Sequence, residues 1–308
     1  MAQGGMSEPP QSASADRVRE TFASLRAASL QPGLHLIATL IGNLGDVTLR
    51  ALAALERADV LYCEDTRHSR KLLAHYGMER PTRPYHEHNG DRERPRILAE
   101  LAAGKSVALI SDAGMPLVSD PGFKLVRAAL DAGHTVMSLP GPSAVLTAVA
   151  SAGLATDTFL FAGFLPVRQG QRVARLEELA KVPATLVLFE SPTRLADSLT
   201  DIAAVLGTRQ AAVARELTKL HEEVRRGTPE ELARWAAEAT PKGEVVIVVG
   251  PPGPRSATDD DIATDIAPLL AGMSLAEAAK TVAERLGVPK ARAYDIGLSL
   301  KRAGGEAF

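Results

Sequence analysis

The sequence predicts an α/β protein with two α/β domains, a mainly parallel first sheet and a mixed second sheet, followed by a small helical module. Short apolar runs alternate with amphipathic helical patterns from residue 34 to residue 139, which is typical of βαβ units. Between residues 159 and 249, strand-like runs include neighbours joined by short connections, so we expect a mixed sheet there. A Pro-Pro-Gly-Pro run at 251–254 then predicts a linker before the last helical patterns.

The breaks between these patterns divide the 308-residue chain into four segments. A chain of this length is too long for one typical core, so two domains and an appendage are expected. The α/β domains are expected over 31–142 and 143–251, and the helical module over 258–303. Residues 1–30 begin with much Gly, Ser, Pro and Gln, which predicts a disordered tail, although 18–30 can form a short helix.

Composition narrows the class of protein. The hydrophobic fraction of 45%, the charged fraction of 23% and the net charge of −2 are ordinary for a globular protein, and only a local basic patch is left for a nucleic acid. The single cysteine, Cys63, cannot form an internal disulfide, and no Cys/His spacing resembles a zinc site. We therefore expect a cytoplasmic protein without a metal, a signal peptide or a membrane span.

The first domain has a regular succession of elements. An N-cap for the first helix is expected at Asp46, and Gly104 is expected to end the helix before the third strand. Cys63 lies in the second strand and is expected in the core. The expected strands are 34–39, 60–63, 107–110 and 135–139, and the main helices are 47–58, 92–103 and 122–132.

The loop 111–122, with the sequence SDAGMPLVSDPG, abandons any periodicity directly after an apolar strand. Two glycines, two prolines and two aspartates let its backbone approach a ligand closely. Since ligands of open α/β sheets bind at the carboxyl ends of strands, this loop is the leading candidate for a ligand site.

Two other interpretations concern the same region. Loop 111–122 can also be an ordinary turn in which Asp120 caps a helix that Pro121 begins. Gly104-Lys105-Ser106 resembles the end of a phosphate-binding P-loop, but position 99 is Ala rather than Gly and the strand follows the motif. The P-loop is therefore excluded.

The segment 140–144, with two prolines and a glycine, is expected to be the hinge before the second domain. In the module, Ser274 and Glu277 predict a capping box. A helix-turn-helix and a packing or dimerisation appendage are both consistent with the pattern. The second-domain strands are expected at 159–164, 185–189, 211–215, 223–227 and 244–249, and the module helices at 259–270, 274–286 and 289–302.

Ordered motifs along the chain resemble one family, that of ribosomal RNA small subunit methyltransferase I in the tetrapyrrole methylase superfamily. The motifs are IATLIGNLGD at 37–46, EDTR at 64–67, YHEHN at 85–89, loop 111–122, LPGPSA at 139–144, 161–166, ESP at 190–192 and RELTKLHEE at 215–223. The resemblance runs from about residue 34 into the helical module. It implies a tetrapyrrole-methylase-like fold, with the cofactor S-adenosylmethionine folded into the cleft between the two domains.

The resemblance also implies a function. The family transfers a methyl group from S-adenosylmethionine to the 2′-hydroxyl of a cytidine in the decoding region of 16S ribosomal RNA, and superfamily members are typically homodimers. Leu40, Met115 and Leu117 depart from the Pro, Thr and Gly usual in the family. A methylase acting on a tetrapyrrole or other small molecule, and an RNA-binding factor without activity, are the rival interpretations.

Site residues follow from the motifs and from the chemistry of the cofactor. A general base is expected among Asp65, His86, Glu87 and His88, with Glu64 a further candidate, although each can also be a capping or loop residue. Arg67, Arg70 and Lys71 can bind RNA phosphates or form a solvated helix face. The cofactor-binding residues are expected to be Leu40, Ser111, Asp112, Ala113, Gly114, Met115, Pro116, Val118, Pro142, Ser143, Ala144, Phe161, Phe189, Glu216 and Gly243.

Overall fold

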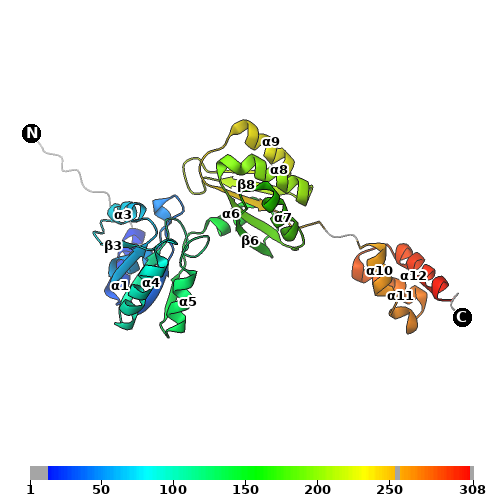
Figure 1. Cartoon of the computed structure of the whole chain (residues 1–308), viewed down its shortest axis with the longest axis horizontal. Helices are drawn as coiled ribbons and strands as arrows, with labels where there is room; N and C mark the ends of the chain where they lie inside the picture. Colours follow the sequence, from blue (N-terminus) through cyan, green and yellow to red (C-terminus); the bar gives the residue numbers. More distant parts are fainter. Residues whose placement is uncertain (1–12, 254–256, 306–308) are drawn as a thin grey trace, which may run out of the picture. The chain divides into compact units, whose positions relative to one another are not determined.

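The computed structural model describes residues 13–253 and 257–305, and it divides into two compact units between Pro251 and Pro252 (Figure 1). The first unit contains two five-stranded sheets, which we call sheet A and sheet B. The second unit is helical. Among the described residues, no helix combines the length and apolar character needed to cross a membrane.

Sheet A is entirely parallel, with the strand order β3-β2-β4-β1-β5, as the alternation of strands and helices predicts. Its central strands are buried along their whole length, which is usual for a parallel sheet covered by helices on both faces. The strands are β1 (Gly33–Ile37), β2 (Val60–Cys63), β3 (Thr82–Pro84), β4 (Ser106–Ile110) and β5 (Val136–Leu139).

Helices cover both faces of sheet A. Leu55 and Ile110 belong to a buried cluster beneath α2 and α3, whereas Tyr62, Ile97 and Leu125 belong to a second cluster beneath α4 and α5. The helices are α1 (Ala13–Ala27), α2 (Leu49–Arg57), α3 (Thr66–His75), α4 (Gly90–Ala102) and α5 (Phe123–Asp131).

Two N-terminal details differ from the sequence prediction. Asp46 is not the cap of α2, because it lies in a short 3-10 turn, Leu44–Asp46, and the Thr48 side chain accepts the capping bond from Ala51 N (3.1 Å). The expected tail contains helix α1, whose Phe22 packs on the core beside α2 and whose Arg26 pairs with Glu56. Residues 1–12 lie outside the described residues.

Sheet B is mixed, as predicted, with the strand order β6-β7-β10-β8-β9. Only β6 and β7 pair in parallel, and the other three pairs are antiparallel. The strands are β6 (Phe159–Phe164), β7 (Thr185–Glu190), β8 (Ala211–Arg215), β9 (Glu223–Gly227) and β10 (Val245–Val249).

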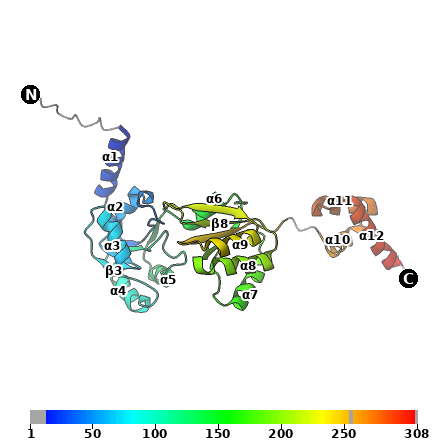
Figure 2. The ribbon, with the colours of Figure 1, turned by 90° about the horizontal axis from the view of Figure 1, so that it is seen from above.

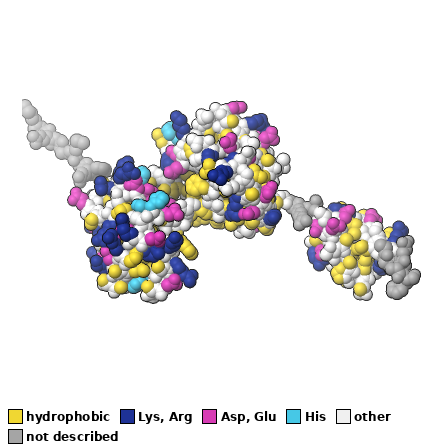
Figure 3. Space-filling model, in the orientation of Figure 1, with side chains coloured by type: hydrophobic (Ala, Val, Ile, Leu, Met, Phe, Trp, Pro, Cys, Tyr) yellow, Lys and Arg dark blue, Asp and Glu magenta, His cyan; other side chains and the backbone are white. Residues whose placement is uncertain are grey.

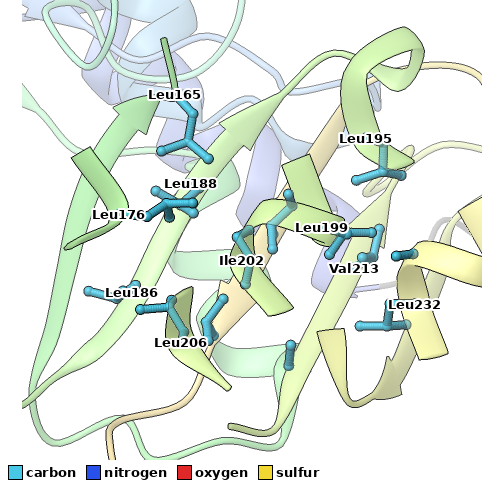
Figure 4. Close-up of a cluster of buried hydrophobic side chains, with 14 of the residues drawn as sticks. Leu165, Leu176, Leu186, Leu188, Leu195, Leu199, Ile202, Leu206, Val213 and Leu232 are labelled. Atoms are coloured by element: carbon cyan, nitrogen blue, oxygen red, sulfur yellow. The ribbon is translucent and has the colours of Figure 1, made fainter. Parts of the chain in front are cut away.

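Helix α6 (Ala144–Ala152) covers one face of sheet B, and α7 (Gln169–Ala180), α8 (Leu195–Leu206) and α9 (Pro229–Ala239) cover the other (Figure 2). Leucine and isoleucine side chains from the three helices interleave with those of the strands to form the core on that second face (Figure 4). At about 25 cal/mol per Å² of buried apolar surface, such leucine-rich packing is a main source of this layer's stability.

The second unit consists of α10 (Asp259–Ile266), α11 (Leu275–Leu286) and α12 (Lys290–Gly305). Ile262, Ile266, Ala278 and Val282 are fully buried in its core. The predicted capping box is confirmed, since the Ser274 side chain accepts from the backbone of α11 and Glu277 accepts from the Ser274 N–H. The predicted three helices are therefore present as a unit of their own.

Candidate active site

The two central strands of sheet A, β1 and β4, lead the chain in opposite directions. From β1 the chain continues to β2, on the far side of β4, and from β4 it continues to β5, on the far side of β1. A switch of this kind opens a crevice at the carboxyl ends of the strands, where ligands of α/β sheets bind. Thr39 N donates to the Gly114 carbonyl (2.9 Å) and Gly114 N to that of Leu40 (3.1 Å), so the two loops are held together at the switch.

Loop 111–122 has an unusual backbone. Gly114 has a φ of +75°, and a Cβ there would lie 3.3 Å from Ile41 Cγ2 and 3.5 Å from the Pro142 carbonyl oxygen. Leu117 and Ser119 also have positive φ, of 74° and 63°, a conformation that costs a non-glycine residue about 1 kcal/mol or more. Such conformations concentrate at ligand sites, where the surrounding structure holds them in place.

The alternative interpretation, in which Asp120 caps a helix that Pro121 begins, is wrong. Helix α5 begins at Phe123, its N-cap is Gly122, and no side chain caps it. Gly122, with a φ of +139°, separates Asp120 from the helix. Asp120 is partly buried and lines a cavity instead.

A cavity of about 500 Å³ lies against loop 111–122 and receives residues from both sheets. Sheet A contributes the ends of its strands and the loop, while sheet B contributes the ends of β7, β8 and β10. Its walls are formed by Ile41, Glu64, Asp112, Ala113, Gly114, Met115, Val118, Ser119, Asp120, Ser143, Ala144, Val145, Phe164, Phe189, Glu190, Ser191, Pro192, Ala214, Leu217, Gly243, Glu244, Val245 and Val246.

The carboxylates that sheet A brings to this cavity are crowded together. Burial, followed by repulsion from Glu64, raises the pKa of Asp120 to about 7, and the Ser111 hydroxyl opposes this change. Burial and the charge of Asp112 likewise raise the pKa of Glu64. Asp112 itself accepts from Asp65 N (3.0 Å) and contacts His68 Nδ1 (3.3 Å). None of the residues that line the cavity carries a positive charge.

On the sheet B side, Glu216 fixes the loop before β10. Its carboxylate accepts from Lys219 Nζ (2.8 Å) and from Glu244 N (2.9 Å), and the Lys219 ammonium holds the pKa of Glu216 below its usual range. Gly243 has a φ of +91°, and a Cβ there would lie 2.1 Å from Glu216 Oε1. Glu216 therefore positions the cavity wall from behind.

Aromatic rings and a buried ion pair complete the sheet B wall. Phe189 contacts Phe161 and Phe164 edge to face, with centroids 4.8 and 5.5 Å apart. The Glu190 side chain is fully buried and accepts from Arg194 Nε (2.8 Å) and Ser191 N (2.7 Å). Because both charges of this pair are matched, the wall behind the cavity is close to neutral.

The structure sorts the predicted cofactor residues into two groups. Those that line the cavity are Asp112, Ala113, Gly114, Met115, Val118, Ser143, Ala144, Phe189 and Gly243. Leu40, Ser111, Pro116, Pro142, Phe161 and Glu216 are not among the lining residues, and several of them hold the lining loops through bonds and packing already described. Most of the lining residues that the prediction did not name lie within or next to a motif that the sequence singled out. The residues that it did not name are Ile41, Ser119, Asp120, Val145, Phe164, Glu190, Ser191, Pro192, Ala214, Leu217, Glu244, Val245 and Val246.

Of the residues predicted to include a base, Glu64 lines the cavity, whereas Asp65, His86, Glu87 and His88 lie outside its lining. Asp65 is the N-cap of α3 and binds Arg67 through a salt bridge of 2.6 Å, and Arg67 holds the pKa of Asp65 well below its usual range. His86 is half-buried and close enough to Glu64 to influence its pKa, whereas Glu87 and His88 are exposed. Their assignment as bases stays a prediction.

Two family models and a set of relatives match the sequence. The model of the tetrapyrrole (corrin/porphyrin) methylases matches residues 33–233. A protein of Mesorhizobium japonicum, named ribosomal RNA small subunit methyltransferase I, is 52% identical over 282 residues, which cover 91% of this chain and 96% of that protein. The chain belongs to the ribosomal RNA small subunit methyltransferase I family.

Further comparisons agree with this membership in the ribosomal RNA small subunit methyltransferase I family. A family member of the same name from Halalkalibacterium halodurans is 43% identical over 85% of this chain and 93% of its own length. The model named RsmI C-terminal HTH domain matches residues 256–301, which contain α10, α11 and most of α12.

Solved structures support the fold alone. A cobalt precorrin-4 methyltransferase (20% identity, TM-score 0.52) and a diphthine synthase (16% identity, TM-score 0.56) each cover 70% of this chain, and 94% and 89% of their own. The two-sheet unit is thus the tetrapyrrole methylase fold.

Proposed function

We propose that this chain transfers a methyl group from S-adenosylmethionine to the 2′-hydroxyl of a cytidine in the decoding region of 16S ribosomal RNA. Membership in the ribosomal RNA small subunit methyltransferase I family supports the reaction and the RNA substrate. The observation that carries the proposal in this structure is the cavity at the switch point of sheet A, formed around Gly114.

The residues of the cavity fit the cofactor. S-adenosylmethionine has an adenosine half, which needs apolar walls and backbone partners, and a half with sulfonium and ammonium charges, which needs nearby anions. Ala144, Val246 and Phe189 provide the apolar surface, and the close approach of Gly114 exposes backbone groups. Glu64, Asp112 and Asp120 provide negative charge in a wall without cations.

Positioning is the main task of the chain in this reaction. The bound cofactor supplies an activated methyl group. The residues of the cavity hold the ribose oxygen in line with it and exclude water, which can account for much of the rate enhancement. Removal of the hydroxyl proton requires a base within reach of the ribose, and Asp65, His86, Glu87 and His88 are the residues predicted from the sequence.

A basic surface near the cavity is proposed to bind RNA phosphates. Figure 3 shows Lys and Arg side chains gathered over α3 and in the region of α4. Arg67, Arg70 and Lys71 of α3 are exposed, and Arg67 is held by Asp65. Phosphate contacts of this kind fix the RNA without reading its sequence.

The helical unit is proposed to add RNA contacts. Arg285 and Arg292 bind Asp265 and Asp259 within the unit, which limits their availability. Between residues 257 and 302, the other exposed cations are Lys280, which lies 3.9 Å from Glu284, and Lys290, Lys301 and Arg302. Truncation after Gly253 is therefore expected to weaken RNA binding while sparing cofactor affinity.

A homodimer in the cytoplasm is the assembly we propose. Large apolar side chains are exposed on α5, where Phe123 is 72% exposed, and in the loop after β6, where Val167 is 74% exposed. Contact with a second copy would cover such residues. Cys63 is a free, buried thiol, which is consistent with a reducing compartment.

Mass mapping of ribose methylation tests the proposed function. The 16S ribosomal RNA from cells that lack this protein is expected to lose one 2′-O-methylcytidine, which the purified chain and S-adenosylmethionine restore on small subunits. Calorimetry with S-adenosylmethionine checks the cofactor independently. An unchanged methylation map, or methyl transfer to a tetrapyrrole instead, would contradict the proposal.

A further inference from the structure

The Asp120 side chain lines the cavity, and no cation among the described residues neutralises it. It lies at the end of loop 111–122, lines the cavity and is partly buried. Over residues 13–253 and 257–305, no salt bridge reaches its carboxylate. Carboxylates are rarely buried without a cation unless the site needs their proton affinity.

The groups around Asp120 are mostly anionic. Glu64, at the end of β2, and Asp112, at the start of the same loop, both repel the Asp120 charge. His86 influences Glu64 rather than Asp120, and the Ser111 hydroxyl stabilises the Asp120 carboxylate. Burial and this repulsion together raise the pKa of Asp120 to about 7. Efficient proton acceptors have pKa values near the working pH.

We propose that Asp120 is the general base that accepts the proton of the ribose 2′-hydroxyl. The proposal rests on the proposed function. The O–H bond breaks and its proton moves to an Asp120 carboxylate oxygen, while a lone pair of the ribose oxygen forms the new bond to the methyl carbon. The carbon–sulfur bond breaks with its electron pair kept by sulfur, so the sulfonium becomes a neutral thioether.

The other carboxylates of the cavity are less suited to this role. Glu190 is neutralised by Arg194, and Glu244 contacts Lys219. Asp112 is occupied by Asp65 N and His68. Glu64 also lacks a salt-bridge partner in the described part of the chain, but its carboxylate accepts a hydrogen bond from the Asp112 backbone, which opposes the rise in its pKa. We therefore assign Glu64 a positioning role, in which its charge raises the proton affinity of Asp120.

Asp120→Asn and Glu64→Gln test the proposal in the full chain, with Asp131→Asn as the control, since Asp131 is exposed on α5 outside the cavity. Asp120→Asn is expected to lower the single-turnover rate on small subunits by about 10²–10⁴-fold. Binding of RNA is expected to stay within about threefold, and S-adenosylhomocysteine binding is measured beside it, because Asp120 also contributes negative charge to the cavity. Wild-type rates should rise with pH to a plateau, and Glu64→Gln should move the midpoint of that rise to lower pH.

The proton affinity of Asp120 can also be measured directly, without the methyl-transfer reaction. Carbon NMR of labelled aspartate in the cofactor-free chain should show one carboxyl that titrates near pH 7 and that disappears in Asp120→Asn. Should Asp120→Asn fail to fold, the midpoint shift in Glu64→Gln decides the matter.

The possible failures are distinguishable. An active wild type with an equally active Asp120→Asn, or an Asp120 carboxyl that titrates at an ordinary acidic pH, would overturn the assignment of the base alone. A wild type that binds S-adenosylhomocysteine but methylates no ribosomal RNA would overturn the proposed function and this assignment with it.

Discussion

Sheet A and sheet B both bring carboxylates to the cavity, but the carboxylates differ in whether a cation neutralises them. Glu64 and Asp120, from sheet A and its loop, have no salt-bridge partner among the residues that the structure describes, and their pKa values are raised. Glu190 and Glu244, which line the cavity from sheet B, are bound by Arg194 and by Lys219. The free carboxylates can bind a cationic ligand or accept a proton, whereas the paired ones can only hold structure.

This difference follows from how each sheet ends at the cavity. The parallel strands of sheet A all end at one edge, where their loops converge and crowd together residues from distant parts of the sequence. The antiparallel neighbours β8 and β10 of sheet B bring Glu216 and Glu244 together just beyond their paired residues, and Lys219 reaches both from the turn that follows β8. Sheet A is thus built for chemistry and sheet B for position.

The largest expected effect is on the stability of the sheet B layer. Glu190→Ala should lower the free energy of unfolding by about 3–5 kcal/mol, because it leaves Arg194 and Ser198 without their buried partner. Glu178→Ala removes the exposed partner of Arg175 and should cost under about 1 kcal/mol. Urea denaturation measures both, and a similar small loss in the two variants would show that Glu190 is not structural.

The next prediction compares two glycines of loop regions, to separate the cost of a positive φ from the loss of space for the ligand. Gly114 and Gly104 both have a φ of +75°, but only Gly114 has neighbours near an added Cβ. Alanine at either position should destabilise the chain by about 1 kcal/mol. Only Gly114→Ala should also lose S-adenosylmethionine affinity, by at least tenfold in calorimetry. Equal affinities in the two variants would remove loop 111–122 from the site.

The two sheets should also respond oppositely to pH. The folded chain binds the Asp120 proton more tightly than the unfolded chain does, so this group stabilises the fold at low pH and its contribution is lost as pH rises towards about 7. Glu216, whose pKa is lowered, stabilises the fold above its unfolded pKa and loses that contribution as pH falls.

Asp120→Asn should therefore unfold at higher temperature than the wild type at pH 8, by an amount equivalent to about 1–2 kcal/mol. Glu216→Gln should unfold at lower temperature at pH 7 and approach the wild type in acid. Calorimetric scans across pH measure these differences. Parallel pH curves for the wild type and both variants would be inconsistent with the shifted groups.

The smallest expected effect concerns RNA. Lys71→Gln on α3 should reduce the slope of log affinity against log salt concentration by about 0.7–0.9, as one phosphate contact does. Arg67→Gln should change the slope less, because Arg67 is paired with Asp65. Lys181→Gln, an exposed change beside sheet B, is the control and should leave the slope unchanged. A smaller slope only in Lys181→Gln would place the RNA on sheet B instead.

Much of the fold was predictable because its determinants are local. Apolar strand runs, Gly104 after α4 and the Ser274 capping box all act within a few residues of one another. The prediction for Asp46 was wrong because Thr48, two residues later, can cap the helix equally well. The intervening residues are accommodated by a 3-10 turn that contains Asp46.

The role of Asp120 could not be predicted in the same way. Its sequence neighbours, Pro121 and Gly122, favour a helix cap, whereas burial near Glu64 depends on how β2 and β4 lie side by side. Leu117 is similar, since its positive φ becomes apparent only in the folded loop. Motifs thus located the cavity, but not the charge state of its groups.

Cys63 gives the molecule a built-in reporter. It is the only thiol of the chain, and it lies fully buried at the end of β2 in sheet A. A reagent that modifies thiols can reach it only when that part of sheet A opens, so the labelling rate measures the free energy of that opening in native conditions. Opening confined to sheet B or to the helical unit leaves the thiol protected.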